Sequence, residues 1–289
     1  MTDLWVALSL FSAFSLATSD ALTKRALNKE NEYIIAWLRL FCALPFLVLL
    51  LVFSPFPDPD STFYIACFIG IPLEILALIW YVKALRLSPM SLTLPFLALT
   101  PAFIMITGWV MMDEVVSLRG GVGVILIALG GYLLNISDPR KGVLHPFRSI
   151  ITDRGIRYMI GVSLIYSFTS VIGKIAILHS SPLFFSGAYF VGVTLCFSPV
   201  ILLQSRKIRK DIRQDIKRSV LPGIFYAMMI ISHVFAITMT KVAYMIALKR
   251  TSFLMGAVYG FLFFREKNVT YRLTGAVVMF LGFLLIVLK

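Results

Sequence analysis

Long apolar runs separated by short polar turns recur along all 289 residues. Each run has about twenty residues, the length that a helix needs to cross the hydrocarbon core of a bilayer. Continuous helices satisfy every backbone polar group inside lipid, so we expect an all-α integral membrane protein. The pattern predicts ten spans, near 4–24, 33–53, 62–84, 89–111, 118–136, 156–177, 183–204, 219–239, 243–264 and 271–288.

Two longer polar segments, 137–155 and 204–219, interrupt this pattern. The first separates two groups of five spans. The second is strongly basic and carries Ile208, Ile212 and Ile216 at helical spacing. It is either a short amphipathic helix on the membrane surface or an ordinary charged loop.

The two groups of spans resemble each other at an offset of about 150 residues. The chain therefore divides into a first five-helix repeat at 1–137, a basic connecting loop at 138–155 and a second repeat at 156–289. The repeat superposes four pairs of side chains: Lys24 on Lys174, Trp37 on Tyr189, Glu114 on Glu266 and, after one inserted residue, Arg119 on Arg272.

Five is an odd number of spans, so the two repeats must have opposite orientations in the membrane. Inverted repeats are a recurring plan of secondary transporters, in which the binding site lies between the repeats near the bilayer midplane. We therefore expect two inverted five-helix repeats around a central cavity, with alternating access as one repeat rocks against the other.

Composition supports this class. Hydrophobic residues make up 59% of the chain and charged residues 14%, which is too little charge to cover a globule in water. The net charge of +13 is better explained by basic loops against anionic lipid than by nucleic acid. Cys42, Cys67 and Cys196 show no metal-ligand or paired spacing, so we expect packing roles and no cofactor or metal. The N-terminal run indicates a first span rather than a cleavable signal peptide.

Glu74 lies near the centre of the third expected span. A charge there costs at least about 2.5–3.5 kcal/mol, so such residues normally face a cavity or a partner. Tyr81 shares its helix face, and the repeat superposes Glu74 on Tyr226 and Tyr81 on His233. These four residues are the leading candidate site for a substrate or a proton. The alternatives are a neutral glutamate that holds helices together and a histidine that only completes a buried hydrogen bond.

Further candidates lie in other spans. Lys249 and Arg250 enter early in the ninth expected span, where they would bind an anionic substrate group or pair with an acid. Trp37 and Tyr189 would line the cavity or anchor the chain at the membrane interface.

Ionisable residues near span ends favour structural or gating roles over substrate binding. We expect Asp20 to form a local ion pair with Lys24, and Glu114 and Glu266 to act by capping or by pairing with Arg119 and Arg272.

Prolines mark the fourth expected span. Pro95 and Pro101 should bend this helix, because proline removes a backbone donor and crowds the preceding turn. The second repeat has no proline at the matching positions, so the fourth span is the expected bent wall or hinge.

Segments 84–95, 97–114 and 248–267 resemble the motifs of EamA-type members of the drug/metabolite transporter superfamily. Asp113 stands before Glu114 where glycine is common in that family. The resemblance implies ten spans in a five-plus-five arrangement, a central cavity, and movement of small metabolites, often outward, without ATP hydrolysis.

We therefore expect a secondary transporter in the cell membrane, plasma or inner, that exports a small amphipathic metabolite, an amino acid or amine first, with proton coupling. The alternative is a flippase or transporter for a lipid-linked or phosphorylated headgroup. A membrane enzyme is less favoured, because the chain has no H-E-x-x-H, P-loop or G-x-S-x-G motif. A monomer and a homodimer both stay open. The distribution of basic residues predicts both termini outside, whereas relatives in the superfamily are expected to keep them in the cytoplasm.

Overall fold

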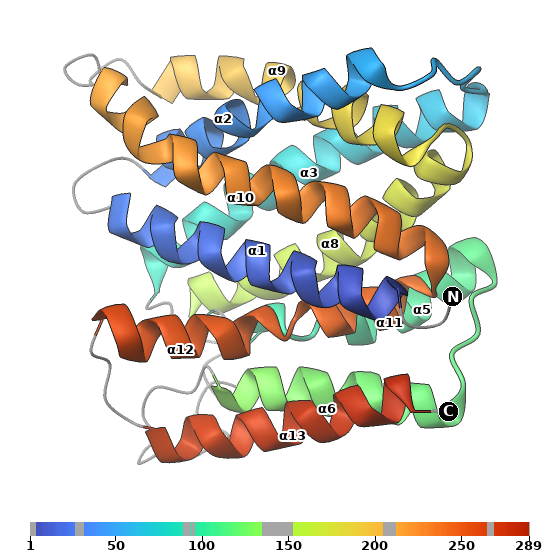
Figure 1. The fold of residues 1–289 in the computed structure, drawn as a ribbon. Coiled ribbons are helices and arrows are strands. Elements are labelled where there is room, and N and C mark those ends of the chain that lie inside the picture. The colour runs from blue at the N-terminus through green and yellow to red at the C-terminus, as the bar shows by residue number, and fades with distance from the viewer. Residues whose placement is uncertain are drawn as a thin grey trace.

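The computed structural model describes residues 4–26, 32–88, 93, 96–134, 153–204, 212–264 and 269–288. The helices lie side by side with their long axes roughly parallel (Figure 1). They are α1 (Leu4–Ala26), α2 (Glu32–Phe53), α3 (Ser61–Leu87), α5 (Thr100–Met112), α6 (Leu118–Leu134), α8 (Arg154–Leu178), α9 (Pro182–Gln204), α10 (Ile212–Met239), α11 (Val242–Lys249), α12 (Ser252–Phe264) and α13 (Val269–Val287).

Six of these helices are long and apolar enough to cross a membrane: α1, α2, α3, α8, α9 and α10. The chain is therefore an integral, multi-pass membrane protein. The helix α6 is apolar but shorter, the side chains of α13 are described only from Thr274 onward, and the fourth and ninth expected spans are interrupted. The count of ten crossings stays a prediction.

The ends of α3 and α8 are fixed by polar side chains. Asp60 accepts a hydrogen bond from the Phe63 amide at 3.1 Å and caps the start of α3. Asp153 caps α8 in the same way, through the Ile156 amide at 3.0 Å. The Ser88 hydroxyl, at the end of α3, donates to the same Asp153 carboxylate. One aspartate therefore starts α8 and ties it to α3.

The second basic segment lies partly inside a helix. α10 begins at Ile212, seven residues before the expected start at 219, and Ile216 packs against the core. Residues 205–211 lie outside the described part of the chain. A surface helix separate from the eighth span is therefore not what the described residues form.

The pair α6 and α13 closes one side of the molecule, and the two helices run antiparallel (Figure 1). A Cβ atom placed on Gly123 would lie 2.8 Å from the Gly282 carbonyl oxygen, and one on Gly130 would lie 2.6 Å from that of Gly275. The repeat equates Gly123 with Gly275 and Gly130 with Gly282. The two close contacts are therefore equivalent under a two-fold axis that crosses the helices, the geometry that inverted repeats require.

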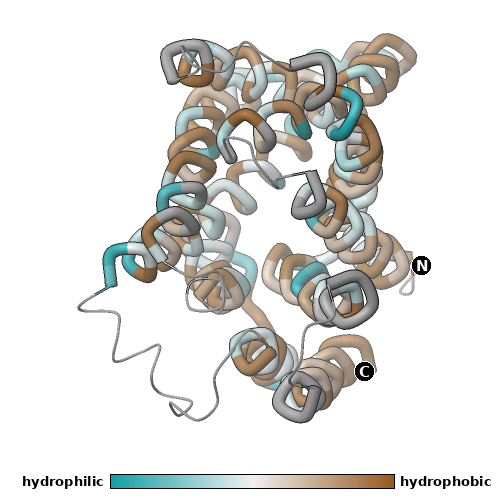
Figure 2. Tube along the Cα trace, turned by 90° about the vertical axis from the view of Figure 1, so that its left-hand side faces the viewer, coloured by the Kyte–Doolittle hydropathy of each residue, from teal (hydrophilic) through white to brown (hydrophobic). Residues whose placement is uncertain are grey.

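The remaining helices pack as two bundles that each draw on both repeats. α1, α2, α10, α11 and α12 form the α1–α10 bundle, and α3, α5, α8 and α9 form the α3–α8 bundle. The repeat exchanges one bundle for the other. Viewed along their axes, the helices form a ring with α6 and α13 set to one side (Figure 2). The two repeats are intertwined, so a motion that separates one repeat from the other would break the most extensive helix contacts.

Candidate functional site

The ninth expected span is interrupted at Arg250 and Thr251, between α11 and α12. The Thr251 amide bonds to the Leu248 carbonyl at 3.0 Å, three residues back, which is a tighter turn than an α-helix makes. The Thr251 hydroxyl donates to the Leu248 carbonyl at 2.7 Å. A side-chain hydroxyl thus competes for backbone partners and favours the interruption.

The first repeat is interrupted at the equivalent place, at Ala98 and Leu99. The Leu99 amide bonds to the Phe96 carbonyl at 3.2 Å, and α5 then begins at Thr100. Pro95 lies outside the described residues. The fourth span is interrupted as expected, and the ninth span is interrupted at Thr251 without a proline, so the bend is not confined to the proline-containing span.

The two interruptions meet across the two bundles. The Arg250 Nη2 donates to the Thr100 hydroxyl at 2.9 Å, and the guanidinium lies over the Phe253 ring at 5.8 Å. No acid pairs with Arg250 among the described residues. Arg250 therefore links the two interruptions through the neutral Thr100 hydroxyl. No described carboxylate neutralises the Arg250 charge by direct contact.

Glu74 projects from α3 toward the same region. The Thr169 hydroxyl lies within its hydrogen-bonding reach, and the Lys249 ammonium is close enough to act on it electrostatically. Lys249 in turn lies 3.5 Å from His233, measured from Nζ to Nδ1. The acid, the base and the histidine singled out in the sequence are thus brought together, with Glu74 in one bundle and the two bases in the other.

Tyrosines surround this charged group. Tyr166, Tyr189 and Tyr226 are all close enough to Glu74 to interact electrostatically. Tyr81, two turns beyond Glu74 on α3, lies near the charges that the α1–α10 bundle contributes. The predicted quartet is therefore gathered in one region, together with two tyrosines of the α3–α8 bundle.

Trp37 and Tyr189 occupy interior positions. The Trp37 indole Nε1 donates to the Ser198 hydroxyl at 3.0 Å, which links α2 to α9 across the two bundles. Tyr189 is only 6% exposed and stacks on Phe185 with ring centroids 4.8 Å apart. These contacts favour the interior alternative over anchoring at the membrane interface.

Arg39 is a charged residue of this region that sequence reasoning missed. Its Nη1 lies 2.5 Å from the Asp20 Oδ1, and its guanidinium lies 4.4 Å from the centroid of the Tyr226 ring. Asp20 therefore pairs with Arg39 of α2, and its predicted pairing with Lys24, whose side chain lies outside the described ones, stays a prediction. The available signal was an arginine inside an apolar run, which poses the same solvation problem as Glu74.

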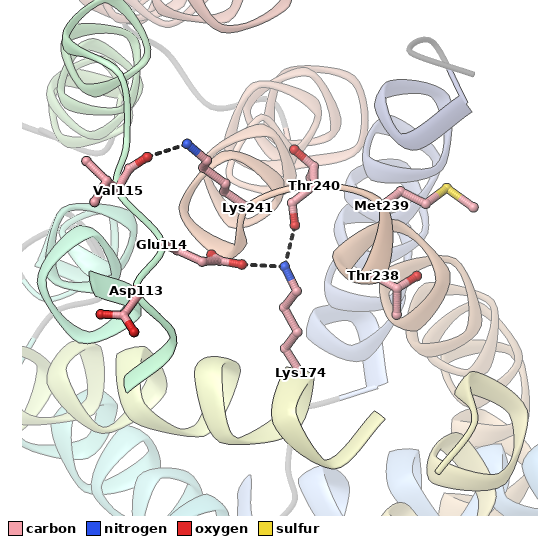
Figure 3. Close-up of a pocket in the computed structure, with 8 residues that line it drawn as sticks. All are labelled: Asp113, Glu114, Val115, Lys174, Thr238, Met239, Thr240 and Lys241. Carbon is pink, nitrogen blue, oxygen red and sulfur yellow. Dashed lines mark hydrogen bonds and ion pairs between the residues drawn. The ribbon is translucent and has the colours of Figure 1, made fainter. Parts of the chain in front are cut away.

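A pocket of about 510 Å³ lies at the end of the molecule where both termini are found (Figures 1 and 3). Its lining combines charged, polar and apolar side chains and comes from the segment after α5, from α8, from the end of α10 and from the turn between α10 and α11. The lining residues are Asp113, Glu114, Val115, Lys174, Thr238, Met239, Thr240 and Lys241.

A buried ion pair closes the floor of this pocket. The Lys174 Nζ lies 2.5 Å from the Glu114 Oε1 and donates to the Thr240 carbonyl at 2.6 Å (Figure 3). The Glu114 Oε2 accepts from the Val242 amide at 2.8 Å. Glu114 therefore pairs with Lys174 and not with Arg119, which is exposed on α6. The pair belongs to the α3–α8 bundle and is hydrogen-bonded to the turn between α10 and α11 in the other bundle.

The remaining candidates lie beyond the described side chains. Glu266 falls outside the described residues, and only the backbone of Arg272 is described, within α13. Their predicted partnership stays a prediction.

Comparison with known proteins identifies the family of this chain. The model of the EamA-like transporter family matches residues 3–136 and, a second time, residues 153–288. The chain belongs to the EamA-like transporter family. This protein is therefore a membrane transporter of the drug/metabolite transporter superfamily, as the sequence motifs indicated.

Other comparisons of this EamA-like transporter add the fold alone. One solved crystal structure, titled only as that of a protein, has 12% sequence identity and a TM-score of 0.76. The similarity covers 97% of this chain and 95% of that one. No curated protein matches the chain.

Proposed function

We propose that this protein is a secondary transporter that exports a small amphipathic metabolite, with an amino acid ranked first, across the cell membrane by alternating access. The proposal rests on one observation. Glu74 from the α3–α8 bundle lies within electrostatic reach of Lys249, which precedes Arg250 in the α1–α10 bundle, near the place where two helices are interrupted. Interrupted helices near the midplane are a common way to build substrate sites in transporters.

An amino acid fits the charges of this region. Its carboxylate would interact with Lys249 and Arg250, and its ammonium would interact with Glu74 and the faces of the surrounding tyrosines. The apolar part of the solute would lie against aromatic rings. A zwitterion is thus matched at both ends without leaving a charge unpaired in the membrane.

The proposed proton coupling depends on the positions of Glu74 and Lys249. Glu74 and Lys249 are in different bundles, so a motion that separates the bundles takes the ammonium away from the carboxylate. A carboxylate left alone inside the membrane is strongly disfavoured, and protonation relieves that cost. We therefore propose that Glu74 takes up a proton as the bundles separate and releases it as they close.

A phosphorylated solute is the second candidate. Arg39, Lys249 and Arg250 supply three cations to this region, against the two carboxylates of Asp20 and Glu74. An excess of positive charge favours a doubly charged anion, and arginine binds phosphate through two parallel hydrogen bonds. Enzymatic activity is not part of either proposal.

The test begins with a thermal-shift screen of the purified protein against amino acids, amines, nucleosides and sugar phosphates. A ligand that binds only the folded state raises its apparent stability. The best ligand is then followed in proteoliposomes with an imposed pH gradient, for the native protein, Glu74→Gln and the control Asp58→Asn at an exposed turn.

We expect Glu74→Gln to fold and insert normally but to lose pH-dependent transport, while the Asp58→Asn control keeps it. Normal transport by Glu74→Gln with an unchanged pH profile would show that Glu74 is a packing residue. Stabilisation by sugar phosphates alone would favour the second candidate.

A further inference from the structure

Asp20 is unusually exposed for an acid on a membrane helix. Its side chain is 58% exposed. The lipid-facing side of α1 is marked by the exposed apolar residues Leu4, Phe11 and Phe14. Asp20 is nine residues beyond Phe11, which is two and a half helical turns and places it on the opposite side of the helix. Its exposure is therefore on the side of α1 that faces the other helices and not on the lipid-facing side.

Arg39 contacts Asp20 from α2. Its side chain is 17% exposed, and the contact with Asp20 uses only the Nη1 group. The guanidinium lies over the Tyr226 ring at 4.4 Å, an interaction that holds the plane of the group whether or not Asp20 is present. Arg39 is thus oriented by an aromatic ring and only partly neutralised by its acid.

Unsatisfied donors point to a missing anionic partner. The Nε atoms of Arg39 and Arg250 are buried and have no hydrogen-bond acceptor among the described residues. Both arginines lie within electrostatic reach of Tyr81, so they flank the same region. A buried donor without a partner is costly, and a group with two or more anionic oxygens would satisfy it.

We propose that Asp20 occupies Arg39 only while the site is empty, and that the anionic group of the substrate, a carboxylate or a phosphate, takes its place. This inference rests on the proposed transport function and assigns Arg39 as a substrate-binding residue. Asp20 acts as an exchangeable counter-ion that keeps Arg39 from remaining unpaired between transport cycles.

Exchange requires that the existing pair be easy to break. A partly exposed ion pair contributes only about 0–1 kcal/mol, and the Asp20 side chain is already more than half exposed while it is paired. A substrate anion can engage Arg39 through two donors where Asp20 uses one. If the substrate is an amino acid, the released Asp20 carboxylate is also available to its ammonium group.

The exchange predicts opposite effects for the two partners. Removing the competing charge with Asp20→Asn should tighten anion binding about fivefold, the factor that corresponds to an ion pair of about 1 kcal/mol. Removing the receptor charge with Arg39→Gln should weaken binding tenfold or more. A purely structural ion pair would make both variants worse.

The measurement is the thermal shift of the purified protein titrated with sodium acetate or with inorganic phosphate, against sodium chloride at equal ionic strength. The acetate arm reports a carboxylate site and the phosphate arm a phosphate site. Asp58→Asn and Arg218→Gln are matched controls at exposed positions, and both should bind like the native protein. Arg39→Lys keeps the charge without the planar fork and should bind between the native protein and Arg39→Gln.

Three results would overturn the exchange. They are unchanged or weaker binding in Asp20→Asn, unchanged binding in Arg39→Gln, and no saturable shift with either anion in both the native protein and Asp20→Asn. The proposed function has a separate readout. If the Arg39 and Asp20 variants behave like the controls while Glu74→Gln still loses pH-dependent transport, the exchange fails and the transport proposal stands.

Discussion

Replacing Lys174 by methionine removes one partner of the ion pair beneath the pocket. The two side chains are 8% and 14% exposed, and the nitrogen–oxygen distance to Glu114 is 2.5 Å. Leaving one member of a buried ion pair without its partner costs about 3–5 kcal/mol. Glu114 keeps the Val242 amide and some contact with solvent, so we expect the lower end, about 3 kcal/mol.

The stability lost in this variant comes from contacts that hold the pocket end of the molecule closed. Lys174 also donates to the Thr240 carbonyl, a contact between the two bundles. A bias of about 3 kcal/mol changes an equilibrium by more than a hundredfold, so the variant should open at this end.

The assay measures how fast a thiol reagent labels a cysteine placed at Thr238, in the pocket, in a background without native cysteines. We expect labelling at least tenfold faster in Lys174→Met than in the protein with Lys174. The double variant with Glu114→Gln should regain part of the lost stability, because no unpaired charge remains buried, and yet label fast. Equal labelling rates, or stability losses that simply add, would refute the closing role of the pair.

Three further predictions test other parts of the molecule. Gly130→Ala should cost about 1–3 kcal/mol, because its Cβ would lie 2.6 Å from a backbone oxygen of α13. Gly256→Ala, which meets nothing within 4 Å, should not lower the melting temperature, and equal losses in both would contradict the close packing. The amide of Phe63 and, second, the ring of His179 hold the pKa of Asp60 below its usual range. The Asp60 carboxylate therefore stabilises the folded protein at pH values above the ordinary aspartate pKa. This stabilisation is lost as the pH falls through the lower pKa of the folded state. Asp60→Asn should therefore lower the melting temperature near neutral pH and converge with the native protein in acid; a difference that persists in acid would exclude this origin. A cysteine at position 210 should resist an impermeant thiol reagent in intact cells, and its labelling would overturn the assignment of the basic loops to the cytoplasm.

The helices were predictable because bilayer thickness fixes their length. The expected spans at 4–24 and 156–177 became α1 and α8 with ends shifted by no more than two residues. The interruption at Thr251 was not predictable from proline, because a hydroxyl that bonds to the Leu248 carbonyl leaves no distinctive mark in the sequence.

Partners across the bundle were harder to predict than the residues themselves. Glu114 was expected to pair with the nearest base along the chain, but its partner Lys174 is sixty residues away and is supplied by the packing of α8 beside α5. Arg39 was not predicted as a site residue, because its contacts are also made between different helices. The repeat places it over a valine, so symmetry did not mark it, and its value became clear only from the contact with Asp20.

The two ends of the molecule are not packed alike, although the repeat makes them equivalent. Among the described residues, α10 packs against α8 and α9, whereas its equivalent, α3, makes much less contact with α1 and α2. The Lys174–Glu114 pair adds hydrogen bonds between the bundles at the end where the pocket lies (Figure 3). The half-exposed Asp20 lies in the C-terminal part of α1, and α1 runs from that end of the molecule toward the opposite one (Figure 1). If the two bundles exchanged their packing according to the two-fold axis, the tighter packing would move to the other end of the molecule. The contacts needed there are equivalent to contacts that the repeat already provides. The alternating access that we propose therefore needs no new interface, only the exchange of two non-equivalent packings between equivalent helices.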